Sequence, residues 1–132
     1  MYNKGQVSIW IGNFNSLGDL EKYIQTEYID DSVCLDSRFE TDFNIEYYDE
    51  DFREINILDN PQDSFRCLLQ EHSYCNSIIS NYTKNHSDYI GSLYNSVILL
   101  YNYKYDQSVK EIEKEGIYIK YIGSVEYDEK EY

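Results

Sequence analysis

The chain has 132 residues, of which 42% are hydrophobic and 17% aromatic, so it can fold as one domain and is too apolar for a disordered acidic polymer. Its 25 acidic and 11 basic residues give a net charge of −14, which repels nucleic-acid phosphates and anionic membrane surfaces. This charge argues against direct nucleic-acid or membrane binding and favours a basic protein partner, although solubility alone would also explain it.

Two features of the sequence predict a cytoplasmic protein. The apolar run from Val7 to Phe14 is too short for a signal peptide or a membrane span. The three cysteines, Cys34, Cys67 and Cys75, are an odd number, which suits reduced thiols better than a disulfide framework.

The first predicted element is a strand over residues 6–14. This segment is rich in β-branched and aromatic residues, and its isoleucines and Val7 alternate with Ser8, Trp10 and Gly12. The alternation predicts a strand with two different faces.

Two helices are predicted next, each from a capping pair. Ser16 and Asp19 begin a helix over residues 16–28, in which apolar side chains recur at helical spacing: Leu17, Leu20, Ile24 and Tyr28. Ser37 and Glu40 form a second capping pair, and the apolar side of that helix carries Leu35, Phe39 and Phe43.

Residues 46–54 are the most concentrated acidic and aromatic stretch of the chain. They predict a loop that leads into a short strand at Ile55 and Ile57.

Two further helices are predicted after this strand. Asn60 and Pro61 resemble an N-cap and a first helical residue, which predicts a helix from residue 61 whose buried face holds Phe65, Leu68 and Leu69. A further helix is predicted over residues 74–85, after a break near Ser73, with Ile78, Ile79 and Tyr82 facing inward.

Two more strands are predicted in the last third of the chain. The run that begins at Ser96 is apolar on both faces, which is typical of a strand in the middle of a sheet. Residues 117–127 alternate after a charged connection that ends at Gly116, and we expect this strand to pair antiparallel with the first. Residues 128–132 are mostly charged and should fray.

The element order predicts a single α+β domain that spans residues 1–132. It would contain a mainly antiparallel or mixed sheet of about four strands, with helices packed on it. We find no internal repeat or linker that would divide the chain.

The sequence favours a protein without catalysis or cofactors. It has no glycine-rich phosphate loop, no G-x-S-x-G motif and no H-E-x-x-H motif. Its two histidines, His72 and His86, stand in or at the ends of predicted helices among ordinary surface residues, which leaves little room for a catalytic triad. We therefore predict no enzyme.

No metal site is predicted either. Cys67, His72 and Cys75 could meet around a helical break, but their spacing matches no strong zinc pattern and a fourth ligand is missing. The carboxylates at residues 49–51 lack the spacing of a calcium loop, and alternating directions in an extended segment would keep them from converging.

The acidic stretch is instead our candidate for a protein-binding site. Tyrosine is enriched where proteins meet, because it offers a rigid apolar face with a polar tip. We predict that the binding residues are Tyr47, Tyr48, Asp49, Glu50 and Asp51. A solvated acidic loop is the alternative.

Three blocks of the sequence resemble, in order, the immunity protein 22 family of bacterial polymorphic toxin systems. The first is VSIWIGNF at residues 7–14, with a W-x-G signature at Trp10 and Gly12. The second is FNIEYYDEDF at residues 43–52, and the third combines NSVILLY at 95–101 with YIGSV at 121–125. The resemblance spans nearly the whole chain.

The resemblance implies an α+β inhibitor that is encoded beside a secreted or contact-delivered toxin and neutralises it inside the producing cell. The expected partner is then a cognate toxin with a basic surface, and a nuclease is favoured because nucleases carry such surfaces. Trp10 and Gly12 match the family signature, but a strand tryptophan usually fills the core and a glycine permits close packing, so we expect both to be structural. A small acidic regulator or homodimeric scaffold unrelated to toxins is the alternative, and the sequence does not distinguish a monomer from a homodimer.

Overall fold

The fold is built on one antiparallel sheet of five strands, in the order β4-β5-β1-β7-β6. The computed structural model describes the backbone of residues 1–30 and 33–131 and the side chains of residues 1–26 and 36–131. The sheet contains β1 (Tyr2–Asn13), β4 (Arg53–Ser64), β5 (Tyr89–Tyr103), β6 (Glu111–Lys114) and β7 (Ile117–Glu126). A separate two-stranded sheet pairs β2 (Glu27–Asp30) with β3 (Val33–Leu35). The α+β class is confirmed, and the main sheet has five strands where about four were expected.

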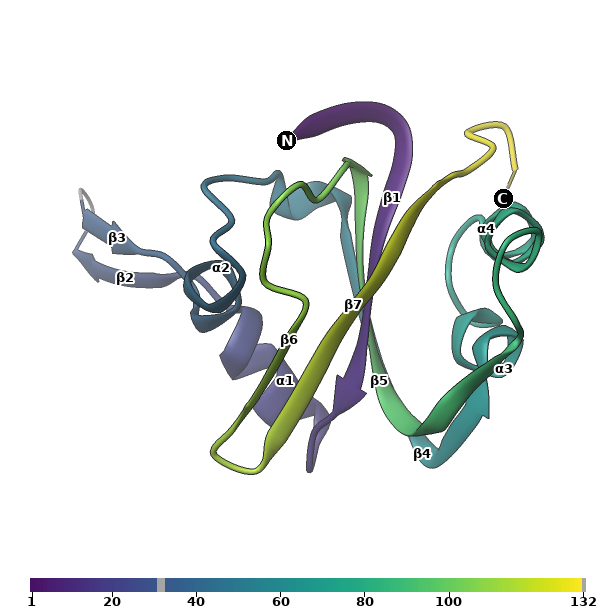
Figure 1. The fold of residues 1–132 in the computed structure, drawn as a ribbon. Coiled ribbons are helices and arrows are strands. Elements are labelled where there is room, and N and C mark those ends of the chain that lie inside the picture. Colours follow the sequence, from purple (N-terminus) through teal and green to yellow (C-terminus); the bar gives the residue numbers. More distant parts are fainter. Residues whose placement is uncertain (31–32, 132) are drawn as a thin grey trace.

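Helices cover both faces of the sheet. One face carries α1 (Leu17–Ile24) and α2 (Arg38–Phe43), and the other carries α3 (Phe65–Leu69) and α4 (Cys75–Thr83) (Figure 1). A short 3-10 helix, η1 (Glu50–Phe52), leads into β4. This arrangement gives two cores, one on each side of the sheet, because each face must be shielded from water.

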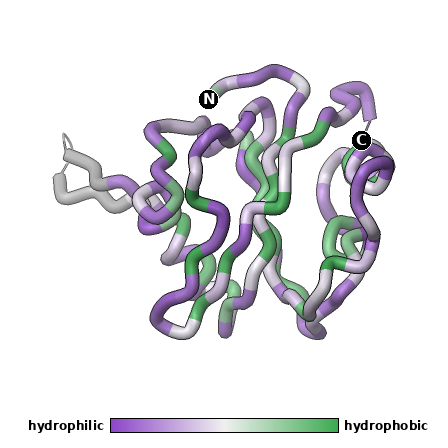
Figure 2. The backbone as a smooth tube through the Cα atoms, viewed as in Figure 1, coloured by the Kyte–Doolittle hydropathy of each residue, from purple (hydrophilic) through white to green (hydrophobic). Residues whose placement is uncertain are grey.

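The central strand β1 contributes to both cores. Trp10 packs toward α1 and α2, whereas Ile9 and Ile11 pack toward α3 and α4. Residues 7–12 are all buried, and hydrophobic residues gather along the central strands between the helices (Figure 2). The predicted strand with two different faces is therefore confirmed.

The helix starts follow their capping residues, but the first helix is shorter than predicted. The Ser16 side chain accepts a hydrogen bond from the Asp19 amide, and Ser37 with Glu40 forms a complete capping box. Helix α1 ends at Ile24, not at residue 28, because Gln25 is extended and β2 begins at Glu27. The residues after Gln25 include Thr, Tyr and Ile, which favour strand over helix. The side chains of Tyr28, Cys34 and Leu35 lie outside the described residues.

The predicted helix start at Pro61 is wrong. Strand β4 continues to Ser64, whose side chain caps α3 by accepting a hydrogen bond from the Cys67 amide. Proline is tolerated here because β4 is an edge strand and its pairing with β5 is interrupted between Ile57 and Gln62. Phe65, Leu68 and Leu69 are nevertheless buried as predicted. The following helix is confirmed as α4.

The strand that contains Ser96 is confirmed as β5, but its position and pairing differ from the prediction. The middle of the sheet is β1, and β5 lies beside it. The strand over residues 117–127 is confirmed as β7, yet it pairs with β1 and not with β5. Because β1 is antiparallel to both, β5 and β7 run parallel to each other with β1 between them.

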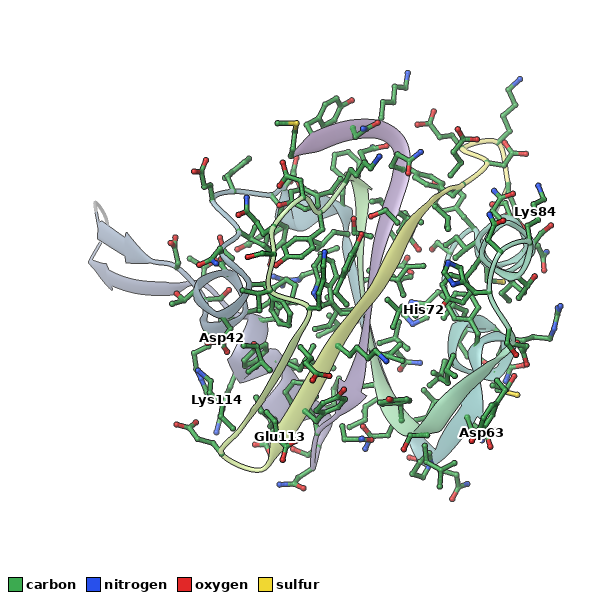
Figure 3. All side chains as sticks on the ribbon, viewed as in Figure 1. Asp42, Asp63, His72, Lys84, Glu113 and Lys114 are labelled. Carbon is green, nitrogen blue, oxygen red and sulfur yellow. The ribbon has the colours of Figure 1, made fainter. Side chains whose placement is uncertain are left out.

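The charged connection before Gly116 contains the unpredicted strand β6. It forms a hairpin with β7 through a two-residue turn at Glu115 and Gly116, which both have positive φ, as such turns require. Lys114 of β6 forms an ion pair with Asp42 of α2, with 2.6 Å between Nζ and Oδ1 (Figure 3). This ion pair ties the edge of the sheet to the helical layer.

The C-terminal tail does not fray through Glu131. The Glu131 carboxylate accepts hydrogen bonds from the backbone amides of Asn76 and Ser77 in the first turn of α4. These amides have no partner within their own helix, so a carboxylate at this position satisfies them. Tyr132 lies outside the described residues.

Candidate protein-binding surface

The acidic loop, residues 46–54, connects α2 to β4 at the end of the sheet where β5 ends and β1 begins (Figure 1). Its backbone is ordered by η1, which Asp49 caps by accepting a hydrogen bond from the Asp51 amide at 2.9 Å. A loop held in this way on a sheet can present its side chains in a fixed arrangement.

The structure separates the two adjacent tyrosines of this loop. The Tyr47 side chain is 75% exposed, whereas Tyr48 is only 7% exposed and belongs to the core under α1 and α2. Burial raises the pKa of the Tyr48 hydroxyl, against which its hydrogen bond with Arg53 acts. Asp49, Glu50 and Asp51 are exposed. Tyr48 is therefore not a surface anchor as predicted, but a core residue that fixes the loop.

Arg53 connects the loop to the first helix. Its guanidinium donates hydrogen bonds to the Tyr48 hydroxyl at 2.8 Å and to the Ile24 carbonyl oxygen at 3.3 Å. The second contact satisfies a carbonyl at the C-terminal end of α1, where intrahelical partners are missing. The base of the loop is thus anchored to both β4 and α1.

An aromatic hollow of about 190 Å³ lies between the acidic loop and the strand ends. Of the nine described residues that line it, six are aromatic and one, Asp49, carries a carboxylate. Three of these rings are large exposed apolar surfaces: Tyr47, Tyr2 at 71% and Phe52 at 44% exposure. Tyr2 and Phe52 were not predicted, because Tyr2 is distant in sequence and only the fold brings it to the loop.

Asn102 shapes the floor of the aromatic hollow. Its φ of 58° is in the left-handed region, which asparagine adopts more readily than most residues. Its Oδ1 accepts hydrogen bonds from the Gly5 amide at 3.0 Å and from the Tyr127 hydroxyl at 2.8 Å. One side chain therefore joins the ends of β5, β1 and the segment after β7.

A second hollow of about 390 Å³ on the same loop is acidic. Its lining includes the exposed residues Asp36, Glu46, Asp49, Glu50 and Asp51, and among the described residues that line it there is no lysine or arginine. The Thr26 hydroxyl donates to Glu50 at 2.6 Å. Carboxylates that share one concave surface reinforce one another's field, so this surface attracts cations.

A polar network at the start of β4 involves His72, which is buried. Its Nδ1 lies 3.1 Å from the Glu54 carboxylate, and it packs between the sheet and the α3 and α4 layer (Figure 3). Ser73 donates to the same carboxylate through its amide and its hydroxyl, and the Tyr101 hydroxyl lies 3.1 Å from it. Burial alone would raise the pKa of Glu54, but the hydrogen bonds from His72 and Ser73 outweigh it and lower that pKa to about 2.

The network predicts an acid-dependent contribution to stability. Because the pKa of Glu54 is lower in the folded chain than its ordinary value of 4.5, its stabilising contribution is complete above about pH 4.5 and is lost as the pH falls through about 2. Replacing Glu54 with glutamine should therefore lower the free energy of unfolding at pH 7 by about 1–2 kcal/mol, towards the lower end because the side chain is partly exposed. Urea unfolding from pH 7 to pH 2 checks this: the difference from the parent should shrink with acidification. Asp63→Asn, at an exposed acid of the same strand, is the control, and a pH-independent difference would contradict the assignment.

The other predicted chemical groups do not assemble into a site. Cys67 and Cys75 are free thiols, and within the described residues no three histidine, cysteine, aspartate or glutamate side chains are grouped as metal ligands. His86 is exposed and stacks on Tyr82. Among the described helices, none is long and apolar enough to cross a membrane.

Trp10 and Gly12 lie inside the fold and away from the surface. Trp10 is fully buried, and its ring is 5.1 Å from that of Phe39. A Cβ atom at Gly12 would lie 2.1 Å from the Tyr118 carbonyl oxygen on β7, so only glycine fits this close approach of two strands.

Comparison with known proteins places the chain in a family. A family model described as Immunity protein 22 matches residues 7–128, which include β4, β5, β6 and β7, the part of β1 from residue 7 onward, and the acidic loop. No curated protein and no solved structure matches the chain.

Proposed function

The chain belongs to the immunity protein 22 family. We propose that it acts in the cytoplasm of the cell that produces it, and that it protects this cell by covering a basic active-site or substrate-binding surface of a cognate toxin. The observation that carries this proposal is the acidic loop, where exposed aromatic rings stand among exposed carboxylates on a rigid support. Inhibition would then result from occlusion of the toxin and would require no chemistry by this chain.

The charge of the surface supports a toxin that binds nucleic acid. A nuclease must attract phosphates, so its active-site cleft is lined by lysine and arginine. The carboxylates at residues 49–51 would be attracted to the same cleft, and the net charge of −14 would accelerate the encounter. A nuclease is therefore the toxin class that we favour.

The exposed aromatic rings supply what charge alone lacks. Rim charges act mainly on the association rate, whereas slow dissociation requires large side chains buried at the centre of the interface. Tyr47, Tyr2 and Phe52 are positioned to provide that apolar centre, with the carboxylates around it. Hydrogen bonds of Arg53 and Asn102 hold in place the backbone segments that carry these rings. The segments would therefore lose little conformational entropy on binding.

Co-expression with the product of the adjacent gene tests the proposed function. Cells that express that product alone should lose viability, and the chain should restore growth and form a stable complex with the product on purification. If the adjacent product is toxic and the chain neither restores growth nor binds it, the proposal is wrong. If the chain binds a partner that is not toxic, the reading as an acidic regulator replaces it.

A further inference from the structure

The aromatic hollow has the composition of a site for a cationic side chain. It combines rings from three segments, Tyr2, Tyr47 with Phe52, and Tyr103, around the carboxylate of Asp49. Aromatic faces attract cations through their quadrupole, and a carboxylate at the same place adds a charge-assisted hydrogen bond. The volume of about 190 Å³ is smaller than the roughly 300–1,000 Å³ of small-molecule sites, but it is suited to one side chain.

The chain already uses this kind of contact internally. The guanidinium carbon of Arg38 lies 5.5 Å from the centre of the Tyr23 ring, and that of Arg53 lies 6.0 Å from the Tyr48 ring. In the first case a carboxylate completes the arrangement, because the same Arg38 guanidinium forms an ion pair with Glu115. Among the described side chains, none of the cations that lie over aromatic rings stands over the exposed rings of the hollow.

We propose that the aromatic hollow binds the guanidinium group of an arginine from the partner protein. This rests on the proposed function only in identifying the partner as the toxin. Arginine fits better than lysine, because its planar guanidinium is weakly hydrated, stacks on aromatic faces and pairs with a carboxylate through two parallel hydrogen bonds. The carboxylates of Glu50 and Asp51 line the acidic hollow, which shares Tyr47 and Asp49 with the aromatic one; their negative charge favours a cation there and disfavours an acidic side chain.

The geometry of Asp49 is compatible with this role. Its Oδ1 accepts the Asp51 amide, which fixes the orientation of the carboxylate at the start of η1. An ionised carboxylate offers about four acceptor positions, so capping one amide leaves capacity for a guanidinium. Asparagine at this position would keep the cap oxygen but lose the charge.

A peptide titration tests the inference without the toxin. The probe is a capped Gly-Arg-Gly peptide, and the control peptide carries citrulline, which has the same shape as arginine but no charge. In NMR spectra of the full chain, the arginine peptide should shift the ring signals of Tyr2, Tyr47 and Phe52 saturably, whereas the citrulline peptide should not. Asp49→Asn should lower the affinity for the arginine peptide by about tenfold or more, as expected for loss of a charged hydrogen-bond partner.

Matched variants locate the effect. Tyr47→Ala should also lower the affinity for the arginine peptide. Asp63→Asn, which makes the same substitution as Asp49→Asn but at an exposed acid far from the hollow, should leave that affinity unchanged. Equal binding of citrulline, equal binding of a lysine peptide, or unchanged affinity in Asp49→Asn would each overturn the inference. If the peptide results overturn the inference but the chain still protects cells, the proposed function stands. If the arginine peptide binds as expected but the chain does not protect cells, the arginine site stands and the proposed function is wrong.

Discussion

Replacing Trp10 with alanine is expected to lower the free energy of unfolding by about 3–5 kcal/mol, the usual cost of truncating a large aromatic side chain in a core. Trp10 is fully buried at the centre of the core under α1 and α2. Its ring is 5.2 Å from those of Tyr105 and Tyr121, and alanine would leave these rings facing an empty space. Among the described residues, its Nε1 has no hydrogen-bond partner, so the loss would come from packing alone.

Urea unfolding followed by far-UV circular dichroism measures this loss. Tyr47→Ala is the matched control, because it also removes an aromatic ring but from an exposed position, and it should change stability by about 0.5 kcal/mol or less. If Trp10→Ala does not fold, Trp10→Phe should give a smaller, measurable loss. Unchanged stability in both Trp10 variants would mean that Trp10 is not the centre of this core.

Local structure was predictable from this sequence where neighbouring residues determine it. The capping pairs that begin at Ser16 and Ser37 identified two helix starts, and alternation identified β1 and β7. The pairing of strands was not predictable, because it depends on contacts between segments far apart in the chain. An example is the order of the last strands: β5 and β7 are separated in the sequence only by the short strand β6, yet in the sheet β1 lies between them.

The misplaced helix at Pro61 shows how a local signal can mislead. Asn followed by Pro is compatible with a helix start, but also with an irregular edge strand, and the edge position of β4 is a property of the whole sheet. The hairpin strand β6 was missed for a related reason. Its residues are mostly charged, and the useful signal was the Glu115 and Gly116 turn, not the strand itself.

The candidate site was predictable in position but not in composition. The density of acids and aromatics identified residues 47–51, and four of these five residues are exposed. Adjacent tyrosines look alike in sequence, yet the turn into η1 directs Tyr48 into the core and leaves Tyr47 at the surface. Tyr2 and Asn102 join the site only through the pairing of β1 with β5, which no local pattern reveals.

Reversing the charge of the acidic loop should slow association with a basic toxin by about tenfold or more, within the range that electrostatic steering contributes. The variant combines Asp49→Asn with Glu50→Lys and Asp51→Lys, so that asparagine retains the cap of η1. Its association rate should also depend less on salt than that of the parent, because fewer attractive charges remain to be screened. Stopped-flow association at several salt concentrations measures both effects.

A variant with the same change in net charge separates local from global electrostatics. It combines Asp59→Asn with Asp63→Lys and Glu113→Lys, which are exposed, and the last two lie at the end of the sheet opposite the acidic loop (Figure 3). If the acidic loop faces the toxin, this control should slow association much less. In physiological salt the field of an exposed charge is largely screened beyond about 8–10 Å, so charges far from the interface contribute little. Equal slowing in the two variants would mean that only the overall charge matters. Unchanged association and full protection by the folded loop variant would exclude the loop as the interface, and the exposed face of α1 that bears Glu21 would then be the next surface to test.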